Sequence, residues 1–508
     1  MQEFDYLTSL PAIAPEIGLT ILALVVLALD LYLPESQRKN VAYVAAFGMA
    51  ALAVTPFLWA PDAGNGLMWG GMVRHDILSQ VFKVMVLLAG SITSLIALNS
   101  QDVARKGEFY LIIIVSTLGA CLMSAASDLI MVFVALETVS IPLYMLAAFG
   151  RNNQRSIESG VKYFLFGSFA SAIMLYGFSL LYGFSGQTNL YAIAGYLGSP
   201  EFGDNAVPVL VAMVFIFVGF GFKISAVPFH FWTPDVYEGA PTPVTAFVSV
   251  ASKAASMALL IRFFVAVFPE TLIIEGQDIH NIWIQMIAAV AVISMTLGNV
   301  LALSQRNIKR LLAYSSIAQA GYTLIGVAAI QSQAGVALAD TAAVQGVAAV
   351  AFYMFMYTFT NLLAFAVIII FADATGSETI ADFAGLSRRN PWMALAMTIA
   401  LLSLAGIPPA AGFFGKFFLF NAAVKANLEW LAMIGVLNAI VALYYYLVVI
   451  KVIYVDRSED DDKPIVLDMT SAWVLGATAI IVLILGIVPT QVFDWALDGA
   501  NALLAFVS

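Results

Sequence analysis

About fourteen apolar stretches, most of them 18 to 25 residues long, fill most of this 508-residue chain. Each stretch is long enough to cross a hydrocarbon core about 30 Å thick. A water-soluble protein needs roughly 25% charged residues to cover its surface, whereas this chain has 11% charged and 62% hydrophobic residues. The sequence therefore predicts an all-α polytopic membrane protein.

Charge and composition exclude several kinds of site. The net charge of −10 leaves no basic surface for nucleic acid. A single cysteine, Cys121, cannot form an internal disulfide, a thiolate zinc site or a cysteine-ligated iron–sulfur cluster. The three histidines form no close pair of the kind that a haem or zinc would need. We expect no metal and no redox cofactor in this chain.

Hydrophobic segments and loop charges predict the topology. The acidic residues Glu3 and Asp5 do not resemble the basic start of a cleaved signal peptide, so the first span is expected to be retained. The fourteen predicted spans lie at 10–33, 41–60, 76–98, 109–126, 128–149, 157–184, 206–238, 243–268, 282–303, 308–331, 342–371, 392–424, 430–454 and 470–494.

Basic residues alternate between the short loops, which predicts the orientation of the chain. The opposite set of loops has only Arg74 and Lys425. We expect the basic set to face the cytoplasm and both termini to face the periplasm. The basic set consists of Arg38, Lys39, Arg105, Lys106, Arg151, Arg155, Arg306, Lys309, Arg310, Arg388, Arg389, Lys451, Arg457 and Lys463.

The seventh and twelfth predicted spans indicate an internal repeat. Both are about 30 residues long and interrupted, the seventh by Pro228 and the twelfth by Gly406, Pro408 and Pro409. Their offset is about 180 residues, and a weaker match relates 135–146 to 313–324. An offset of five helices, an odd number, inserts the second unit upside down. Inverted repeats with broken helices at matching positions point to a transport site.

Six basic residues lie inside the spans or near their ends, where an ionised side chain at the bilayer centre costs about 2.5–3.5 kcal/mol. Such residues are functional by default. Two of them, Lys83 and Arg262, lie nearer the outer ends and are expected to snorkel to the membrane surface. The full set is Lys83, Lys162, Lys223, Lys253, Arg262 and Lys416.

Glu137 and Lys223 each lie close to a proline inside a span. Pro142 and Pro228 remove amides and so free the backbone carbonyls beside these two side chains. Opened backbone at this depth is tolerated only where it is buried in protein or lines a cavity. Glu137 and Lys223 are therefore candidate functional residues, with a structural ion pair as the alternative for Glu137.

Four further residues are candidates. Lys253 lies in a run of small residues, which leave room for water, and Lys416 follows the break in the twelfth span. His230 follows the break in the seventh span and could pass a proton between lysines, or could simply be hydrogen-bonded. Lys162 forms an i,i+4 pair with Glu158 near the cytoplasmic end, so it could equally snorkel.

Three segments resemble a known family. They are 223–243, 307–322 and 406–417, and together they resemble the antiporter-like membrane subunits of respiratory complex I. Within the first segment, residues 232–243 resemble the corresponding motif of the subunit N branch of that family. Their sequence is Trp-Thr-Pro-Asp-Val-Tyr-Glu-Gly-Ala-Pro-Thr-Pro. The resemblance covers the whole chain.

The resemblance implies a fold and a division of labour. It implies inverted five-helix bundles of helices 4–8, at 109–268, and helices 9–13, at 282–454, preceded by three helices at 1–108 and followed by helix 14 at 470–508. Flavin, iron–sulfur clusters and quinone belong to partner subunits. The partners are the other membrane subunits, including a neighbouring antiporter-like one. The implied proton route comprises Glu137, Lys162, Lys223, His230, Lys253 and Lys416.

The leading hypothesis is a proton-translocating subunit of NADH:quinone oxidoreductase in a bacterial inner membrane. The alternative is a subunit of a multi-subunit cation/proton antiporter or of a membrane-bound hydrogenase, which share the fold and the lysines. A non-conducting scaffold is a third possibility, but it would gain nothing from six basic residues in its spans.

Overall fold

The computed structural model describes residues 9–59, 66–203, 205–331 and 342–507, and most of them are helical. Thirteen helices among these residues are long and apolar enough to cross a membrane. The remaining predicted span, the twelfth, consists of the short apolar helix α18 (Pro391–Ala405) and α19 (Gly412–Lys425). The predicted polytopic helical fold is confirmed.

The spans are formed, in chain order, by α2 (Ala14–Tyr32), α3 (Lys39–Leu52), α5 (Ile77–Ile96), α6 (Gly107–Ala125), α7 (Leu129–Ala147), α8 (Gln154–Ser185), α10 (Val207–Ile224) with α11 (Trp232–Gly239), α12 (Thr242–Phe247) with the π-helix η5 (Val248–Ser252) and α13 (Lys253–Val267), α14 (Ile279–Ala302), α15 (Ile308–Ala328), α16 (Ala343–Thr375), α18 with α19, α20 (Glu429–Tyr454) and α21 (Met469–Ile487).

Shorter elements connect the spans. The helical ones are η1 (Leu10–Ile13), η2 (Glu35–Gln37), α4 (Thr55–Leu58), η3 (Trp69–Gly71), η4 (Ala97–Asn99), α9 (Leu190–Leu197), η7 (Ile380–Phe383), α17 (Leu386–Arg389) and α22 (Thr490–Val507). Two small antiparallel pairs join β1 (Leu67–Met68) to β2 (Val73–Arg74) and β3 (Ile273–Ile274) to β4 (Gln277–Asp278).

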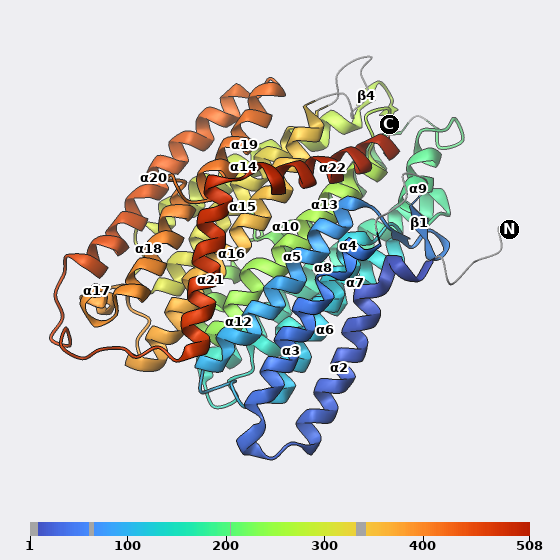
Figure 1. Cartoon of the computed structure of the whole chain (residues 1–508). Coiled ribbons are helices and arrows are strands. Elements are labelled where there is room, and N and C mark those ends of the chain that lie inside the picture. The colour runs from blue at the N-terminus through green and yellow to red at the C-terminus, as the bar shows by residue number, and fades with distance from the viewer. Residues whose placement is uncertain (1–8, 60–65, 204, 332–341, 508) are drawn as a thin grey trace.

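The helices form one elongated array, with α2 at one side and α20 at the other (Figure 1). Central spans are almost wholly enclosed by protein, notably the eighth span and helices α15 and α16. Peripheral helices such as α2, α8 and α20 expose many large apolar side chains. Lipid tails are as apolar as these side chains, so the exposed faces are suited to contact lipid or other membrane subunits.

Both predicted helix breaks are present. Helix α10 ends at Ile224, Ser225 adopts a positive φ of 62°, and α11 starts at Trp232. Helix α18 ends at Ala405, followed by Gly406 with a φ of 87°. Each break contains a cis X-Pro peptide bond. The prolines account for the breaks, because they remove amide donors and clash with the preceding helical turn.

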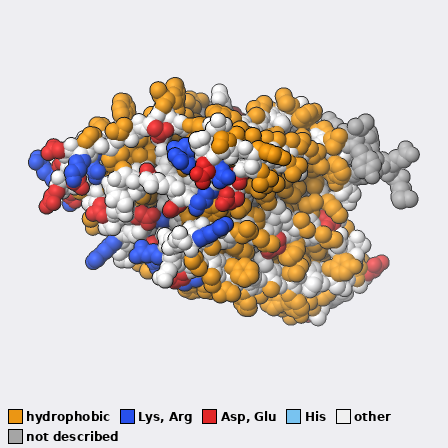
Figure 2. Space-filling model, turned by 90° about the horizontal axis from the view of Figure 1, so that it is seen from below, with side chains coloured by type: hydrophobic (Ala, Val, Ile, Leu, Met, Phe, Trp, Pro, Cys, Tyr) orange, Lys and Arg blue, Asp and Glu red, His pale blue; other side chains and the backbone are white. Residues whose placement is uncertain are grey.

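The charged loops gather at one end of the array. Figure 2 looks onto this end and shows Lys, Arg, Asp and Glu side chains among apolar surroundings. Hydrogen bonds join its loops: the Lys309 side chain donates through Nζ to Ala240 O, and the backbone N–H of Gly385 donates to Asp456 O. The start of α2 and helix α22 lie at the opposite end (Figure 1).

The C-terminal region differs from the predicted fourteenth helix at 470–494. Helix α21 ends at Ile487, and α22 runs across the upper end of the array (Figure 1). Pro489 lies between them and disfavours helical geometry at Val488. Helix α22 packs against α5 and α16, and its residues Ala500 and Leu503 are buried. The residues after the fourteenth span are therefore a separate, crosswise helix.

A buried lysine series as the candidate functional site

Lys223, Lys253 and Lys416 are all buried, with exposed fractions of 3–5%. Each lies beside an irregularity in a helix. Lys223 is in the last turn of α10, Lys253 directly follows the π-helical turn η5, and Lys416 follows the break before α19. Within the described residues, none of the three has a carboxylate within 4.0 Å. Their charges are met by hydroxyls, carbonyls and aromatic rings.

Lys223, from α10, is bonded to the stretch of α7 that contains Glu137. Lys223 Nζ donates to Ser140 Oγ, which in turn donates to the Leu136 carbonyl. Glu137 accepts a hydrogen bond of 2.7 Å from Ser171 Oγ on α8. The ammonium of Lys223 and the carboxylate of Glu137 are therefore connected indirectly, through neighbouring turns of α7. They form no direct ion pair in this structure.

Lys253 is bonded to α15. Its Nζ donates to Ser316 Oγ at 2.6 Å and to the Ser316 carbonyl at 3.0 Å. Ser316 Oγ also lies 3.3 Å from Tyr237 OH, to which it can donate. The π-helical turn before Lys253 was not predicted from sequence, although the small residues at 249–256 signalled an unusual packing site. Such turns occur frequently at functional sites.

Lys416 donates to the carbonyls of Leu404 and Ala405, both at 2.9 Å. In a continuous helix these carbonyls would accept from residues 408 and 409, which are both proline and have no N–H. The break thus exposes two acceptors, and the lysine ammonium binds both. Its Nζ also lies 4.8 Å from the centre of the Tyr322 ring.

Helix α15 connects the Lys253 site to the Lys416 site. Gln319 lies one turn after Ser316 and on the same face. Its Nε2 donates to the Leu404 carbonyl at 3.2 Å, the same oxygen that accepts from Lys416. A polar series therefore runs from Lys253 through Ser316 and Gln319 to Lys416. Gln319 was missed from sequence, although an amide in a buried span is itself a signal.

Tyrosines hold Gln319 in place. Tyr353 OH donates to its Oε1, and its Nε2 donates to Tyr446 OH at 3.2 Å. Tyr446 OH also shares a 2.5 Å hydrogen bond with Ser315 Oγ. Every polar atom of the Gln319 amide is engaged, as burial requires. Gln319 therefore belongs to an ordered hydrogen-bond network with Tyr353, Tyr446 and Ser315.

His230 is buried in the link between α10 and α11, with its ring 4.6 Å from that of Phe231. No hydrogen bond joins it to Lys223 or Lys253 among the described residues. The structure thus places His230 in the broken segment, as the sequence implied, but not hydrogen-bonded to either lysine.

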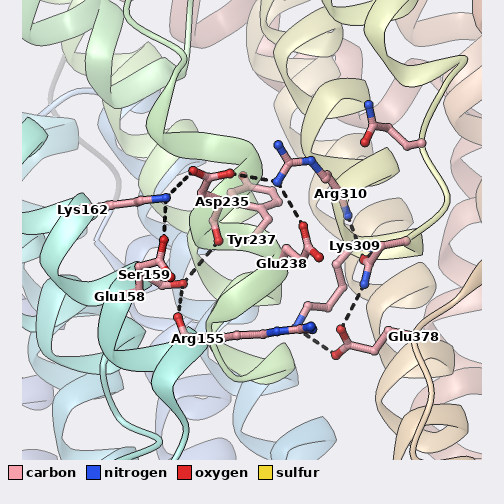
Figure 3. Close-up of polar contacts among 12 residues, drawn as sticks. Arg155, Glu158, Ser159, Lys162, Asp235, Tyr237, Glu238, Lys309, Arg310 and Glu378 are labelled. Carbon is pink, nitrogen blue, oxygen red and sulfur yellow. Dashed lines mark hydrogen bonds and ion pairs between the residues drawn. The ribbon is translucent and has the colours of Figure 1, made fainter.

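Lys162 lies at the charged end of the structure. Its Nζ is 2.7 Å from Glu158 and 2.6 Å from Asp235, and about a third of its side chain is exposed (Figure 3). The predicted pair with Glu158 is present. The pair with Asp235 was not predicted, because it depends on the fold of the broken seventh span. Lys162 therefore differs from the three buried lysines, because it is partly exposed and is paired with carboxylates.

The predicted snorkelling of Lys83 and Arg262 is wrong. Lys83 is buried and lies 2.8 Å from Glu16, and Arg262 donates to both oxygens of Asp76 at 2.7 and 2.8 Å. These carboxylates come from distant parts of the chain. A buried partner satisfies each cation, so neither side chain has to reach the membrane surface.

The described residues contain no group of three or more His, Cys, Asp or Glu side chains that could hold a metal ion.

Comparisons with known proteins agree with this architecture. A family model described as "NADH:quinone oxidoreductase/Mrp antiporter, TM" matches residues 126–442. NADH-quinone oxidoreductase subunit N of Moorella thermoacetica is 41% identical over 97% of this chain and 99% of its own length. NAD(P)H-quinone oxidoreductase subunit 2 of a Nostoc species is 43% identical over 88% of this chain and 82% of its own.

Solved structures show the same fold. A chain of respiratory complex I from Thermus thermophilus is 30% identical, with a TM-score of 0.73 over 94% of this chain and 98% of that chain. A chain of an Mrp complex from a Dietzia species has a TM-score of 0.81 over 98% and 97%, at 20% identity, which shows the fold alone. The relatives that match nearly the full length of this chain include NADH-quinone oxidoreductase subunit N proteins. The chain therefore belongs to the subunit N branch of the antiporter-like membrane subunits of NADH-quinone oxidoreductase.

Proposed function

We propose that this chain translocates protons along its buried lysine series, as a membrane subunit of NADH:quinone oxidoreductase. The observation that carries the proposal is the row of polar groups along α15 between the two buried lysines: Ser316 accepts from Lys253, and Gln319, one turn later, donates to the carbonyl that also accepts from Lys416. A buried amine without a carboxylate partner can exchange its proton, because burial disfavours the charged form. Oxidation and reduction take place in other subunits.

The proposed route begins at the cytoplasmic side with Glu137 and Lys223. It continues past His230 to Lys253, then along α15 to Lys416 and outward. In the second half of this route, hydrogen bonds join Lys253 to Ser316, and Gln319 and Lys416 to the Leu404 carbonyl, while the turn of α15 between Ser316 and Gln319 has to be bridged. The step from Lys223 to Lys253 requires water, which can bridge polar groups nearly as well as a direct hydrogen bond. Lys162 is considered separately below.

The surroundings of the chain are also proposed. We place it in a bacterial inner membrane as a multi-pass protein, with both termini at the periplasmic side. Its exposed apolar helices would contact lipid and other membrane subunits, including a neighbouring antiporter-like subunit. Flavin, iron–sulfur clusters and quinone would belong to the partner subunits that carry out electron transfer.

Replacement of Lys253 tests the proposed function directly. In the assembled complex reconstituted into vesicles, Lys253→Ala should lower NADH-driven proton uptake about tenfold or more, since a proton-transfer group is removed. His230→Ala should have a smaller effect, because a water can occupy its place. The control is Lys451→Ala, at a side chain that is 63% exposed. Normal pumping by Lys253→Ala would refute the proposal, and a more severe His230→Ala would refute this order of roles.

A second test concerns the entrance. Lys223→Ala and Glu137→Gln should each leave assembly largely intact and lower pumping about tenfold or more, because both remove a titratable group. Ser140→Ala removes the hydroxyl that bonds Lys223 and should give an intermediate loss. Proton uptake per NADH oxidised, measured together with the amount of assembled complex, checks this. Wild-type uptake by assembled Lys223→Ala complex would remove Lys223 from the route.

A further inference from the structure

A network of ion pairs at the charged end joins the two predicted repeats through α11 (Figure 3). Lys162 Nζ on α8 lies 2.6 Å from Asp235 Oδ2, and Arg310 Nη1 on α15 lies 2.8 Å from Asp235 Oδ1. Each carboxylate oxygen of Asp235 is thus used by a cation from a different repeat. Arg310 Nη1 is also 3.0 Å from Glu238 Oε2, so α11 is tied to α15 twice.

The other face of α11 contacts the buried lysine series. Tyr237 follows Asp235 by two residues, which turns its side chain about 200° around the helix axis. It is fully buried, and its hydroxyl can accept from Ser316 Oγ at 3.3 Å. The same Ser316 Oγ accepts from Lys253 at 2.6 Å. Helix α11 therefore has ion pairs on one face and a contact with the Lys253 site on the other.

Tight packing makes α11 suited to act as one body. The Trp232 ring stacks on that of Tyr163, with centroids 4.4 Å apart, and its Nε1 donates to the Phe222 carbonyl at 3.1 Å. Thr245 Oγ1 donates to the Tyr237 carbonyl at 3.0 Å. Close-packed elements move between discrete arrangements and do not deform continuously. A change at Asp235 is therefore expected to reach Tyr237.

We infer that Asp235 is a positioning residue of the proton route: its ion pairs with Lys162 and Arg310 fix α11 and so hold Tyr237 against the Lys253–Ser316 pair. Lys162 is then a fixed cation in this network and carries no proton along the route, because its ammonium lies between two carboxylates. The inference rests on the proposed proton translocation and adds the residue that sets the geometry of its central lysine.

Variants of the intact complex in vesicles test the role of Asp235. Asp235→Asn and Tyr237→Phe should each assemble and lower proton uptake about threefold or more, in the range expected for residues that couple sites without contacting the substrate. The pH profile of pumping should be displaced alike in both variants, since both alter the surroundings of Lys253. The double variant should be no worse than the more severe single one, because both changes disrupt one linkage.

Glu158→Gln is the matched control. This carboxylate also binds Lys162, 63% of its side chain is exposed, and no hydrogen bond or ion pair joins it to α11 in the part of the chain that the structure describes. Its pumping and its pH profile should overlay those of the wild type. Equal losses in Glu158→Gln and Asp235→Asn would overturn the inference, because a general loss of surface charge would then explain both. If Asp235→Asn does not assemble, Asp235→Glu is compared with Glu158→Gln in the same way. This variant retains the negative charge but changes the length of the side chain.

Arginine substitution separates a fixed cation from a proton carrier, because arginine stays protonated. Lys162→Arg should pump within about twofold of the wild type, whereas Lys253→Arg should be severely impaired. Failure of Lys162→Arg, with normal assembly, would overturn the role given to Lys162. Normal pumping by both Lys253→Ala and Lys253→Arg would instead refute the proposed function, so the two failures are distinguishable.

Discussion

Lys416→Arg is expected to abolish most proton pumping while leaving the complex assembled. Arginine keeps the positive charge and can still donate to the Leu404 and Ala405 carbonyls, which accept from Lys416 at 2.9 Å. It cannot release its proton in the physiological range. A residue that must alternate between charged and neutral states therefore fails, with an expected loss of about tenfold or more in proton uptake.

The comparison with Lys416→Ala makes this result decisive. The alanine variant loses both the charge and the proton, so similar losses in the two variants would show that proton release is the essential property. The measurement is proton uptake by vesicles per assembled complex. Full activity of Lys416→Arg would show that a fixed positive charge suffices, and the outward exit would then have to lie at another group.

Much of the fold was predictable from local chemistry. A long apolar segment has few alternatives to a transmembrane helix, because every backbone polar group in lipid must be bonded within the protein. The breaks were predictable for a related reason. Pro228, Pro408 and Pro409 remove amide donors wherever the chain folds, so the interruption is encoded at the residue itself. The candidate lysines followed from the cost of burying a charge.

Contacts between distant segments were not predictable from the sequence. Arg262 and Asp76 are 186 positions apart, and nothing near either residue reveals the other. Gln319 acquires its role only when the break after α18 places the Leu404 carbonyl beside it. The pairing of Lys162 with Asp235 depends in the same way on where α11 lies. Local signals identified which groups need a partner, while tertiary packing decided which partner they have.

The two broken spans use their lysines differently. Lys223 precedes its break and donates to a hydroxyl on another helix, Ser140. Lys416 follows its break and donates to the two carbonyls that the prolines leave free. The two breaks of the predicted inverted repeat therefore share a lysine beside an opened helix but differ in its partners. Under the proposed route, one lysine donates to a side-chain hydroxyl and the other to backbone carbonyls.

Arg262→Met is expected to destabilise the protein strongly, in contrast to the functional effect at Lys416. Arg262 is fully buried and donates to both oxygens of Asp76, and also to the Ser124 carbonyl at 3.2 Å. Removing the guanidinium leaves a buried carboxylate whose remaining partners among the described residues are Arg74, 3.2 Å away, and the Ser79 N–H, which donates to Asp76 Oδ1 at 2.8 Å. Breaking a buried ion pair on one side costs about 3–5 kcal/mol, because the remaining charge has lost its compensation.

Two comparisons isolate this effect from a general loss of charge. Arg388→Met breaks an ion pair of 2.7 Å with Asp461, but its side chain is 37% exposed, and such pairs contribute about 0–1 kcal/mol. The double variant Arg262→Met, Asp76→Asn removes the stranded charge and should recover part of the lost stability. Thermal unfolding and the yield of assembled complex measure all three. Equal stability of Arg262→Met and Arg388→Met would mean that water reaches the Asp76 carboxylate, and that this end of α5 is more open than its burial indicates.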